Sequence, residues 1–174
     1  MIRQSLNGLP QHGLAEGYSI RLFRRGDAET WVRVEQESEP WGKIDRKTFD
    51  QNFGDDCDAL ARRQLFLVSP QGRDCGTVTS WYTRRYHGRA WGRIHWLAVA
   101  PQHRGKGLSK ALMTAAMNRM RSLGHRRAML VTDTRRLIAI KTYLDFGFAP
   151  DMRTPNADRA WRLIRKALDH PALR

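Results

Sequence analysis

The sequence has few cysteines and no long apolar segment. Its two cysteines, Cys57 and Cys75, match no metal-ligand spacing, and nothing indicates an oxidising compartment, so we expect no metal site. No stretch approaches the ~20 apolar residues of a membrane-spanning helix, and the N-terminal residues lack the apolar core of a signal peptide. With 174 residues, of which 41% are hydrophobic, the chain is expected to be one globular cytoplasmic domain.

Acidic residues are scarce in the second half of the chain. Residues 84–174 contain 20 of the 31 lysines and arginines but only 5 of the 17 aspartates and glutamates. The formal net charge of +14 therefore arises in this half. Such an excess favours a polyanionic partner, which could be a nucleic acid, a membrane surface or a phosphorylated cofactor. A solvated basic face is the alternative interpretation.

Hydrophobic periodicity predicts an alternation of strands and helices. The expected strands cover 18–22, 64–68, 75–82, 93–100 and 128–131, with a short one near 148–153. The expected helices cover 28–38, 45–61, 108–123, 135–145 and 157–168. A β-hairpin over 63–82 precedes a β-α-β unit, which indicates an α/β sandwich with a mixed sheet and excludes a doubly wound fold. Residues 1–16 are predicted to form a loose arm before a single domain over 17–174.

A basic loop that contains glycine connects the strand over 93–100 to the helix that begins near Leu108. Gly105 and Gly107 would let the backbone approach an anion, and a helix N-terminus offers free N–H groups and the positive end of its dipole. The segment matches neither GxxxxGK[ST] nor GxGxxG, so neither a P-loop nor a Rossmann dinucleotide site is supported. The alternative to an anion site is that the glycines serve only the strand-to-helix turn.

Two motifs in this region resemble the GCN5-related N-acetyltransferase family. The loop Gln102–Gly107 is similar to the family pattern Q/R-x-x-G-x-G/A, and Ala139, Tyr143, Gly147 and Phe148 match A-x-x-x-Y-x-x-x-G-F. The resemblance extends over roughly 63–150. It implies a mixed, mostly antiparallel central sheet flanked by helices. It also implies transfer of an acetyl group from acetyl-coenzyme A (acetyl-CoA) to a primary amine, which could belong to a small molecule or to a protein.

The resemblance also implies which residues bind acetyl-CoA. The backbone of Leu97, Ala98 and Val99 would pair with the pantetheine arm like an added strand. The pyrophosphate would be held by backbone amides of the loop and the helix start: Arg104, Gly105, Lys106, Gly107, Leu108 and Ser109. Where the family often has asparagine, this chain has Arg136, which could bind an anionic part of the cofactor or acceptor, or could pair with Asp133.

Two residues are candidates for proton transfer. Tyr143 matches the family tyrosine, and a phenol can donate a proton to the leaving thiolate. Its alternative role is that of a half-buried helix tyrosine. His95 is a candidate base because imidazole titrates near pH 6.5, and strand alternation predicts that it shares a face with Arg93, Leu97 and Val99. Its alternative role is that of a core histidine, with ordered water as the base.

An acidic stretch near Trp41 comprises Glu35, Glu37 and Glu39. It could attract a cationic amine, but its spacing does not put all three on one helical face, so a solvated face is the alternative. Trp81 and Trp91 flank residues 83–90, predicted as a loop, and could line an acceptor pocket or a subunit contact.

Two other functions remain open: a basic protein associated with nucleic acid or the ribosome, and a domain that binds acyl-CoA without turnover. Many members of the family form dimers, so the resemblance also allows a homodimer, and it leaves the identity of the acceptor amine open.

Overall fold

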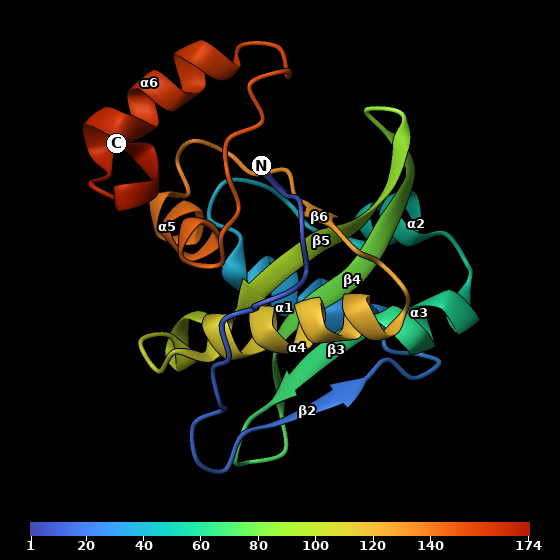
Figure 1. Cartoon of the computed structure of the whole chain (residues 1–174). Coiled ribbons are helices and arrows are strands. Elements are labelled where there is room, and N and C mark those ends of the chain that lie inside the picture. Colours follow the sequence, from blue (N-terminus) through green and yellow to red (C-terminus); the bar gives the residue numbers. More distant parts are fainter.

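A six-stranded sheet forms the centre of the computed structural model, which describes residues 1–174 (Figure 1). In spatial order the strands are β1 (Ile2–Arg3), β6 (Ala128–Met129), β5 (Arg89–Val99), β4 (Asp74–Tyr86), β3 (Gln64–Val68) and β2 (Ser19–Leu22). Only β5 and β6 run parallel. The expected α/β fold with a mixed, mostly antiparallel sheet is confirmed.

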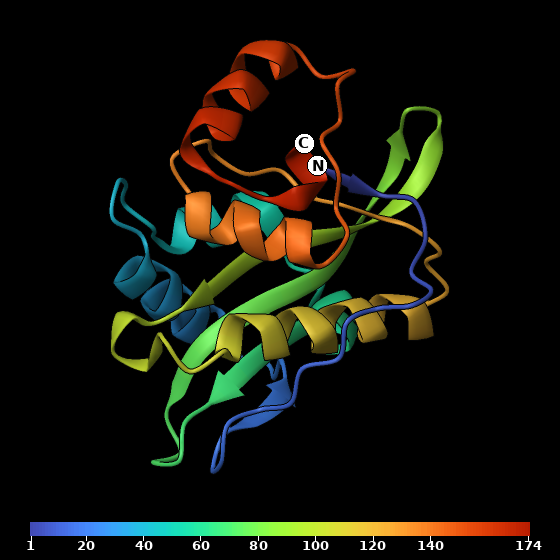
Figure 2. The ribbon, with the colours of Figure 1, turned by 60° about the vertical axis from the view of Figure 1, so that its left-hand side comes forward.

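Helices cover both faces of this sheet (Figure 2). They are α1 (Ala28–Ser38), α2 (Arg46–Phe53), α3 (Cys57–Arg63), α4 (Leu108–Ser122), α5 (Leu137–Asp145) and α6 (Ala157–Ala167). Short 3₁₀ turns occupy Pro101–His103 and Pro171–Leu173. The long helix α4 lies along one face and α1 lies behind the other, whereas α6 and the C-terminus lie beyond α5.

The sheet separates two hydrophobic cores of different composition. The larger core lies on the α4 face and is mostly aliphatic, with Leu112, Met117 and Met120 from α4 and with Tyr143 from α5. The smaller core lies on the α1 and α2 face and is aromatic: Phe23, Trp31, Phe49, Phe53 and Phe66 supply most of it. A third cluster joins α5 to α6 through Ile140, Trp161 and Ile164.

Several predicted boundaries are wrong for local reasons. The single helix expected over 45–61 is two helices, because Gly54 adopts φ +66° and the Asp56 side chain accepts from the Ala59 N–H to start α3. The loop expected over 83–90 is mostly strand: Thr83, Tyr86 and Arg89 are paired, and only residues 87 and 88, at the hairpin tip, lie outside β4 and β5. The strand expected near 148–153 is reduced to one bridge between Ile2 and Ala149.

Residues 1–16 are not loose. Ile2 and Arg3 pair with Met129 and Ala128 at the edge of the sheet, and the N-terminal ammonium group donates to the Leu130 carbonyl at 2.9 Å. Leu6, which is 2% exposed, joins the core on the α4 face. The prediction failed because a two-residue strand carries no periodicity, and its partner lies more than a hundred residues away in the chain.

A β-bulge interrupts β5 and reverses the predicted facing of its residues. Thr79 lies opposite His95 but Thr77 lies opposite Ala98, so two residues of β5 oppose one of β4. Within the bulge Trp96 adopts φ +52°, a conformation that bulky side chains rarely occupy. His95 and Trp96 therefore both contact the aromatic core, whereas Leu97 contacts the core on the α4 face.

Truncating Leu6 tests whether the N-terminal segment contributes to stability. Leu6→Ala should lower the free energy of unfolding by ~2–5 kcal/mol, because it leaves a cavity in the core. Leu163→Ala on α6, where the leucine is 54% exposed, is the matched control and should change it by less than ~0.5 kcal/mol. Urea unfolding measures both variants, and equal stabilities would contradict the packing described here.

Candidate active site

The parallel strands β5 and β6 separate soon after they meet. They pair only at Gly92 with Ala128 and at Arg93 with Met129. Beyond these pairs the chain after β6 leaves the sheet, so Leu97–Val99 have no strand beside them on that edge. A cavity of about 740 Å³ lies there, and its lining comes from the end of α1, from Leu97–Val99, from residues 103–105 and 107–109 and from α5. Its volume is typical of a small-molecule site.

The loop before α4 forms an anion-binding nest at one end of this cavity. The backbone N–H groups of Gly105–Ser109 donate to no carbonyl of the protein. Gly105 and Gly107 have φ +81° and +71°, and a Cβ at either position would meet no atom within 4 Å. Glycine is therefore required by backbone conformation rather than by space, and consecutive free N–H groups in such a turn are typical of anion-binding nests.

The basic side chains of the loop are largely engaged elsewhere. Arg104 donates through Nε to the Val99 carbonyl at 3.0 Å and through Nη2 to the Ser38 carbonyl at 3.3 Å. Lys106 donates to the Tyr18 hydroxyl at 3.2 Å and does not line the cavity. Of the predicted pyrophosphate-binding set, Arg104, Gly105, Gly107, Leu108 and Ser109 reach the cavity. Backbone amides rather than lysine charge therefore make this end attractive to anions.

Tyr143 lies on the buried side of α5 and lines the same cavity. It is 7% exposed. Burial raises the pKa of its phenol to about 12, an effect that Arg136 opposes and Glu35 reinforces. The phenol consequently keeps its proton at neutral pH and can donate it.

Arg136 connects the two sides of the cavity. The helix expected over 135–145 begins at Leu137, so Arg136 precedes α5 instead of lying in its first turn. Its guanidinium pairs with the Glu39 carboxylate at the end of α1. Arg135 pairs instead with Asp133 at 2.7 Å, and both guanidinium groups lie over the ring of Trp41. The structure thus places Arg136 at the cavity, as the sequence predicted, but already paired with a carboxylate.

His95 does not line this cavity. Its ring contacts Phe53 at a centroid distance of 5.4 Å, and only 8% of the residue is exposed. Burial, with a smaller effect of Arg93, lowers its pKa to about 3, so the imidazole is neutral. The bulge at Trp96 explains why His95 lies away from Leu97 and Val99, with which alternation had grouped it.

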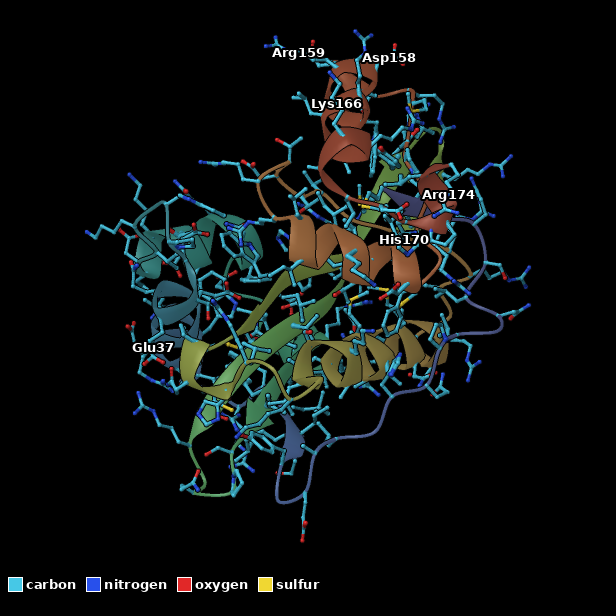
Figure 3. All side chains as sticks on the ribbon, turned by 90° about the vertical axis from the view of Figure 1, so that its left-hand side faces the viewer. Glu37, Asp158, Arg159, Lys166, His170 and Arg174 are labelled. Atoms are coloured by element: carbon cyan, nitrogen blue, oxygen red, sulfur yellow. The ribbon has the colours of Figure 1, made fainter.

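The acidic stretch divides into three environments. Glu37 lies on the outer side of α1 and pairs with Arg33 and Arg73, whereas Glu39 pairs with Arg136 (Figure 3). Glu35 is buried, 5% exposed, and lines the cavity. The burial of Glu35 is predictable from helical spacing. Glu35 follows Ala28 by seven residues and Trp31 by four, so it belongs to the apolar face of α1.

Glu35 is the most perturbed carboxyl group of the cavity. Its Oε1 is inaccessible to solvent and has no hydrogen-bond partner. Burial raises its pKa to about 8, while Arg136 lowers it and Glu39 raises it to smaller extents. A buried carboxyl group without a partner is expensive in free energy, so it is a candidate functional group.

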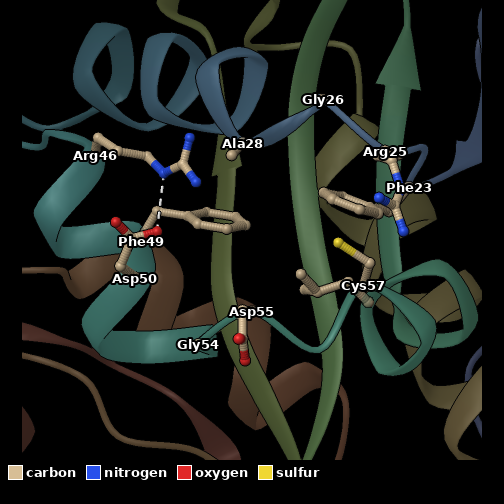
Figure 4. Close-up of a pocket in the computed structure, with 11 residues that line it drawn as sticks. Phe23, Arg25, Gly26, Ala28, Arg46, Phe49, Asp50, Gly54, Asp55 and Cys57 are labelled. Atoms are coloured by element: carbon tan, nitrogen blue, oxygen red, sulfur yellow. Dashed lines mark hydrogen bonds and ion pairs between the residues drawn. The ribbon is translucent and has the colours of Figure 1, made fainter.

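A second cavity, of about 580 Å³, lies between α1, α2 and α3 (Figure 4). Its charged side chains include Arg25, Asp55 and an ion pair at 2.8 Å between Arg46 and Asp50. It contains none of the residues that the sequence singled out, and its largest apolar walls, Phe23 and Phe49, belong to the aromatic core. We find no proton-transfer pair in it.

The surface features add little to the site. Arg159 and Lys166 point outward from α6 (Figure 3), as expected of a solvated basic face. Trp91 is buried and neither it nor Trp81 lines the main cavity. No group of three or more His, Cys, Asp or Glu side chains is arranged to hold a metal ion, and no helix is long and apolar enough to cross a membrane.

An unpaired sheet edge, a loop with free backbone N–H groups and a buried phenol therefore border one cavity. Residues 17–148, which are most of the chain, match the sequence model of the Acetyltransferase (GNAT) family. The chain therefore belongs to this family, as its two motifs predicted.

Known relatives and solved structures agree with this assignment. The mycothiol acetyltransferase of Salinispora arenicola is 31% identical over 151 residues, which is 81% of this chain and 48% of that protein. That of Pseudarthrobacter chlorophenolicus is 29% identical over 154 residues, 80% of this chain and 45% of that protein. The chain thus spans about half the length of these relatives.

Two solved structures share the fold. The aminoglycoside N-acetyltransferase AAC(6')-Iy in complex with CoA superposes with a TM-score of 0.63 at 19% identity, over 84% of this chain and 95% of that one. The ribosomal-protein-S18-alanine N-acetyltransferase of Escherichia coli gives 0.61 at 20% identity, over 78% and 79%.

The buried carboxyl of Glu35 predicts a measurable pH dependence of stability. An ordinary glutamate titrates near pH 4.5, whereas Glu35 in the folded protein has a pKa of about 8. Between these values the unfolded chain binds fewer protons than the folded one, so this residue makes the free energy of unfolding fall as pH rises. Glu35→Gln should remove that fall. Denaturant unfolding at pH 5 and pH 8 measures it, and Glu29→Gln in the first turn of α1 should retain the wild-type difference; an unchanged difference in Glu35→Gln would refute the shifted titration.

Proposed function

We propose that this protein transfers the acetyl group of acetyl-CoA to a primary amine. One arrangement carries the proposal: the unpaired edge of β5, the amide nest of Gly105–Ser109 and the phenol of Tyr143 all border one cavity. An extended chain with a pyrophosphate at one end and a reactive sulfur at the other would meet each of these features in turn.

The residues present fit acetyl-CoA. The free N–H groups of the nest suit a pyrophosphate, because they supply partial positive charge without needing a lysine. The backbone of Leu97, Ala98 and Val99 can pair with amide groups of a pantetheine arm, since no strand occupies that edge. Arg136 lies where it could contact the ligand only by sharing or leaving its pair with Glu39.

When bound, acetyl-CoA supplies a thioester carbonyl that a neutral amine can attack. The residues of the chain would then do three things. The β5 edge would offer backbone N–H donors to the carbonyl oxygen as negative charge develops on it. Tyr143 would hold a proton for the departing sulfur, since its raised pKa keeps the phenol protonated at neutral pH. Leu97, Ala98 and Val99 would supply apolar cavity walls that limit water.

The acceptor is the open part of this proposal. Mycothiol acetyltransferases, an aminoglycoside N-acetyltransferase and a ribosomal-protein-S18-alanine N-acetyltransferase are all similar to this chain. A panel should therefore contain n-butylamine, an aminoglycoside, a peptide with N-terminal alanine and the acceptor of mycothiol acetyltransferases. Release of free CoA thiol by the wild-type protein measures turnover, and no release with any amine would contradict the proposed activity.

His95 as the base, a homodimer and a cytoplasmic location stay predictions. Sedimentation in the presence and absence of acetyl-CoA measures the second.

Acetyl-CoA should stabilise the fold through the nest. At ~100 times its dissociation constant a ligand adds ~2.7 kcal/mol, which a thermal-shift titration detects. Gly107→Asp should abolish the shift, because it introduces negative charge beside the pyrophosphate and strains a position with φ +71°. Gly72→Asp is the matched control: Gly72 has φ +75° and open space in the β3–β4 turn and does not line the cavity, so the variant carries similar strain but should keep the shift.

Removing the hydroxyl of Tyr143 should impair turnover more than binding. Tyr143→Phe should lower kcat by ~10²–10⁴-fold, the usual scale for a general acid, while the thermal shift with acetyl-CoA stays as in wild type. Retention of wild-type kcat with the best acceptor of the panel would leave Tyr143 with a structural role only.

A further inference from the structure

Glu35 is the one acidic side chain of the cavity that no cation pairs with. Arg136 pairs with Glu39, and Arg135 pairs with Asp133 outside the cavity lining. Arg104 is held by the carbonyls of Val99 and Ser38. Oε1 of Glu35 consequently remains without a hydrogen bond, although only 5% of the residue is exposed to solvent.

The surroundings of Glu35 define what could satisfy it. Its own helix contributes Glu39, the segment before α5 contributes Arg136, α5 contributes the phenol of Tyr143, and β5 contributes only apolar side chains and backbone. The charge of Glu35 contributes to the raised pKa of Tyr143, so the two side chains lie close together across the cavity that both line. A ligand group near Glu35 is therefore near the proposed proton donor as well.

We propose that Glu35 binds the ammonium group of the acceptor directly and takes a proton from it, so that Glu35 is a catalytic residue of the acetyl transfer. This inference rests on the proposed function. An ammonium group is the occupant that the site favours, because it brings the missing positive charge and up to three hydrogen-bond donors to an unpartnered carboxylate. A neutral alcohol of the same shape would bring no charge.

The proton balance of the step is complete. One N–H bond of the ammonium group breaks and an O–H bond forms on Glu35, which leaves a neutral amine. Its nitrogen forms the C–N bond to the acetyl carbon while the C–S bond breaks, and the sulfur takes the phenolic proton of Tyr143. The nitrogen then returns its second proton to Tyr143, and Glu35 releases its proton to solvent. No oxidant or further reactant is needed.

Kinetics of Glu35→Gln with the fastest amine of the panel test the proposal. The substitution keeps size and burial but removes the base, so kcat/KM for the amine should fall ~10²–10⁴-fold. The thermal shift with acetyl-CoA should be unchanged, which shows that the variant folds and binds the cofactor. In wild type log(kcat/KM) should rise toward pH 8 and then level, following ionisation of the Glu35 carboxyl, and this limb should vanish in Glu35→Gln. Glu29→Gln should behave as wild type.

A binding measurement separates this role from a structural one. Calorimetry of the same amine with the CoA-bound protein, in two buffers of different ionisation enthalpy at pH 7, counts protons released on binding. A carboxyl group with a pKa of about 8 is mostly protonated at that pH and must ionise to pair with the ammonium group. Wild type should therefore release up to one proton per amine bound, and Glu35→Gln about none.

Each contrary result identifies what fails. If wild-type protein acetylates an amine but Glu35→Gln does so equally well, or releases the same number of protons, the role of Glu35 is overturned and the acetyltransferase activity stands. If His95→Gln removes the pH limb and Glu35→Gln keeps it, His95 is the base. If wild type acetylates no amine, the proposed function itself fails, and the acyl-CoA thermal shift then decides whether binding survives without it.

Discussion

The free backbone edge of β5 is the constraint on which the site depends. Peptide groups that leave water need hydrogen-bond partners, and a sheet normally supplies them strand by strand. Here β5 and β6 supply only two residue pairs before they diverge. The edge that remains is too far inside the molecule to behave as an ordinary exposed edge, yet a ligand with peptide-like groups can pair with it. The anion nest, the phenol and the buried carboxyl group are all arranged around that one gap.

How far the sequence predicts this site depends on whether the signal is local. The loop Gln102–Gly107 and the position of Tyr143 could be predicted, because each rests on a short motif at the start or along the buried face of one helix. The face of His95 could not, since the bulge at Trp96 is defined by register against β4, and no residue pattern within β5 reveals it. Strand β1 was missed for a similar reason: its two residues gain strand geometry only from a partner far away in the chain. Glu35 is the contrary case, because its helical phase with Trp31 was legible in the sequence.

The site combines two features that each oppose folding. Trp96 holds a backbone conformation that costs free energy for a bulky residue, and Glu35 places a carboxyl group where water cannot solvate it. Both lie beside the gap, and the bulge is what re-aims β5 there. The aromatic and aliphatic cores on either side offset these costs. In proteins generally, unfavourable backbone conformations and unpaired buried groups concentrate at functional sites, and well-packed cores elsewhere offset their cost.

The sheet also separates the residues of the site into two groups, one on each of its faces. The amide nest and Tyr143 belong to the α4 side, whereas Glu35 extends from the helix that covers the aromatic core. Substitutions in the two cores share few neighbours, so their effects on free energy should add, except for residues that border the gap itself. Under the proposed function, the side chains of α1 that border the gap could therefore change, and with them the amine that is recognised, while the opposite core keeps the loop before α4 and Tyr143 in place.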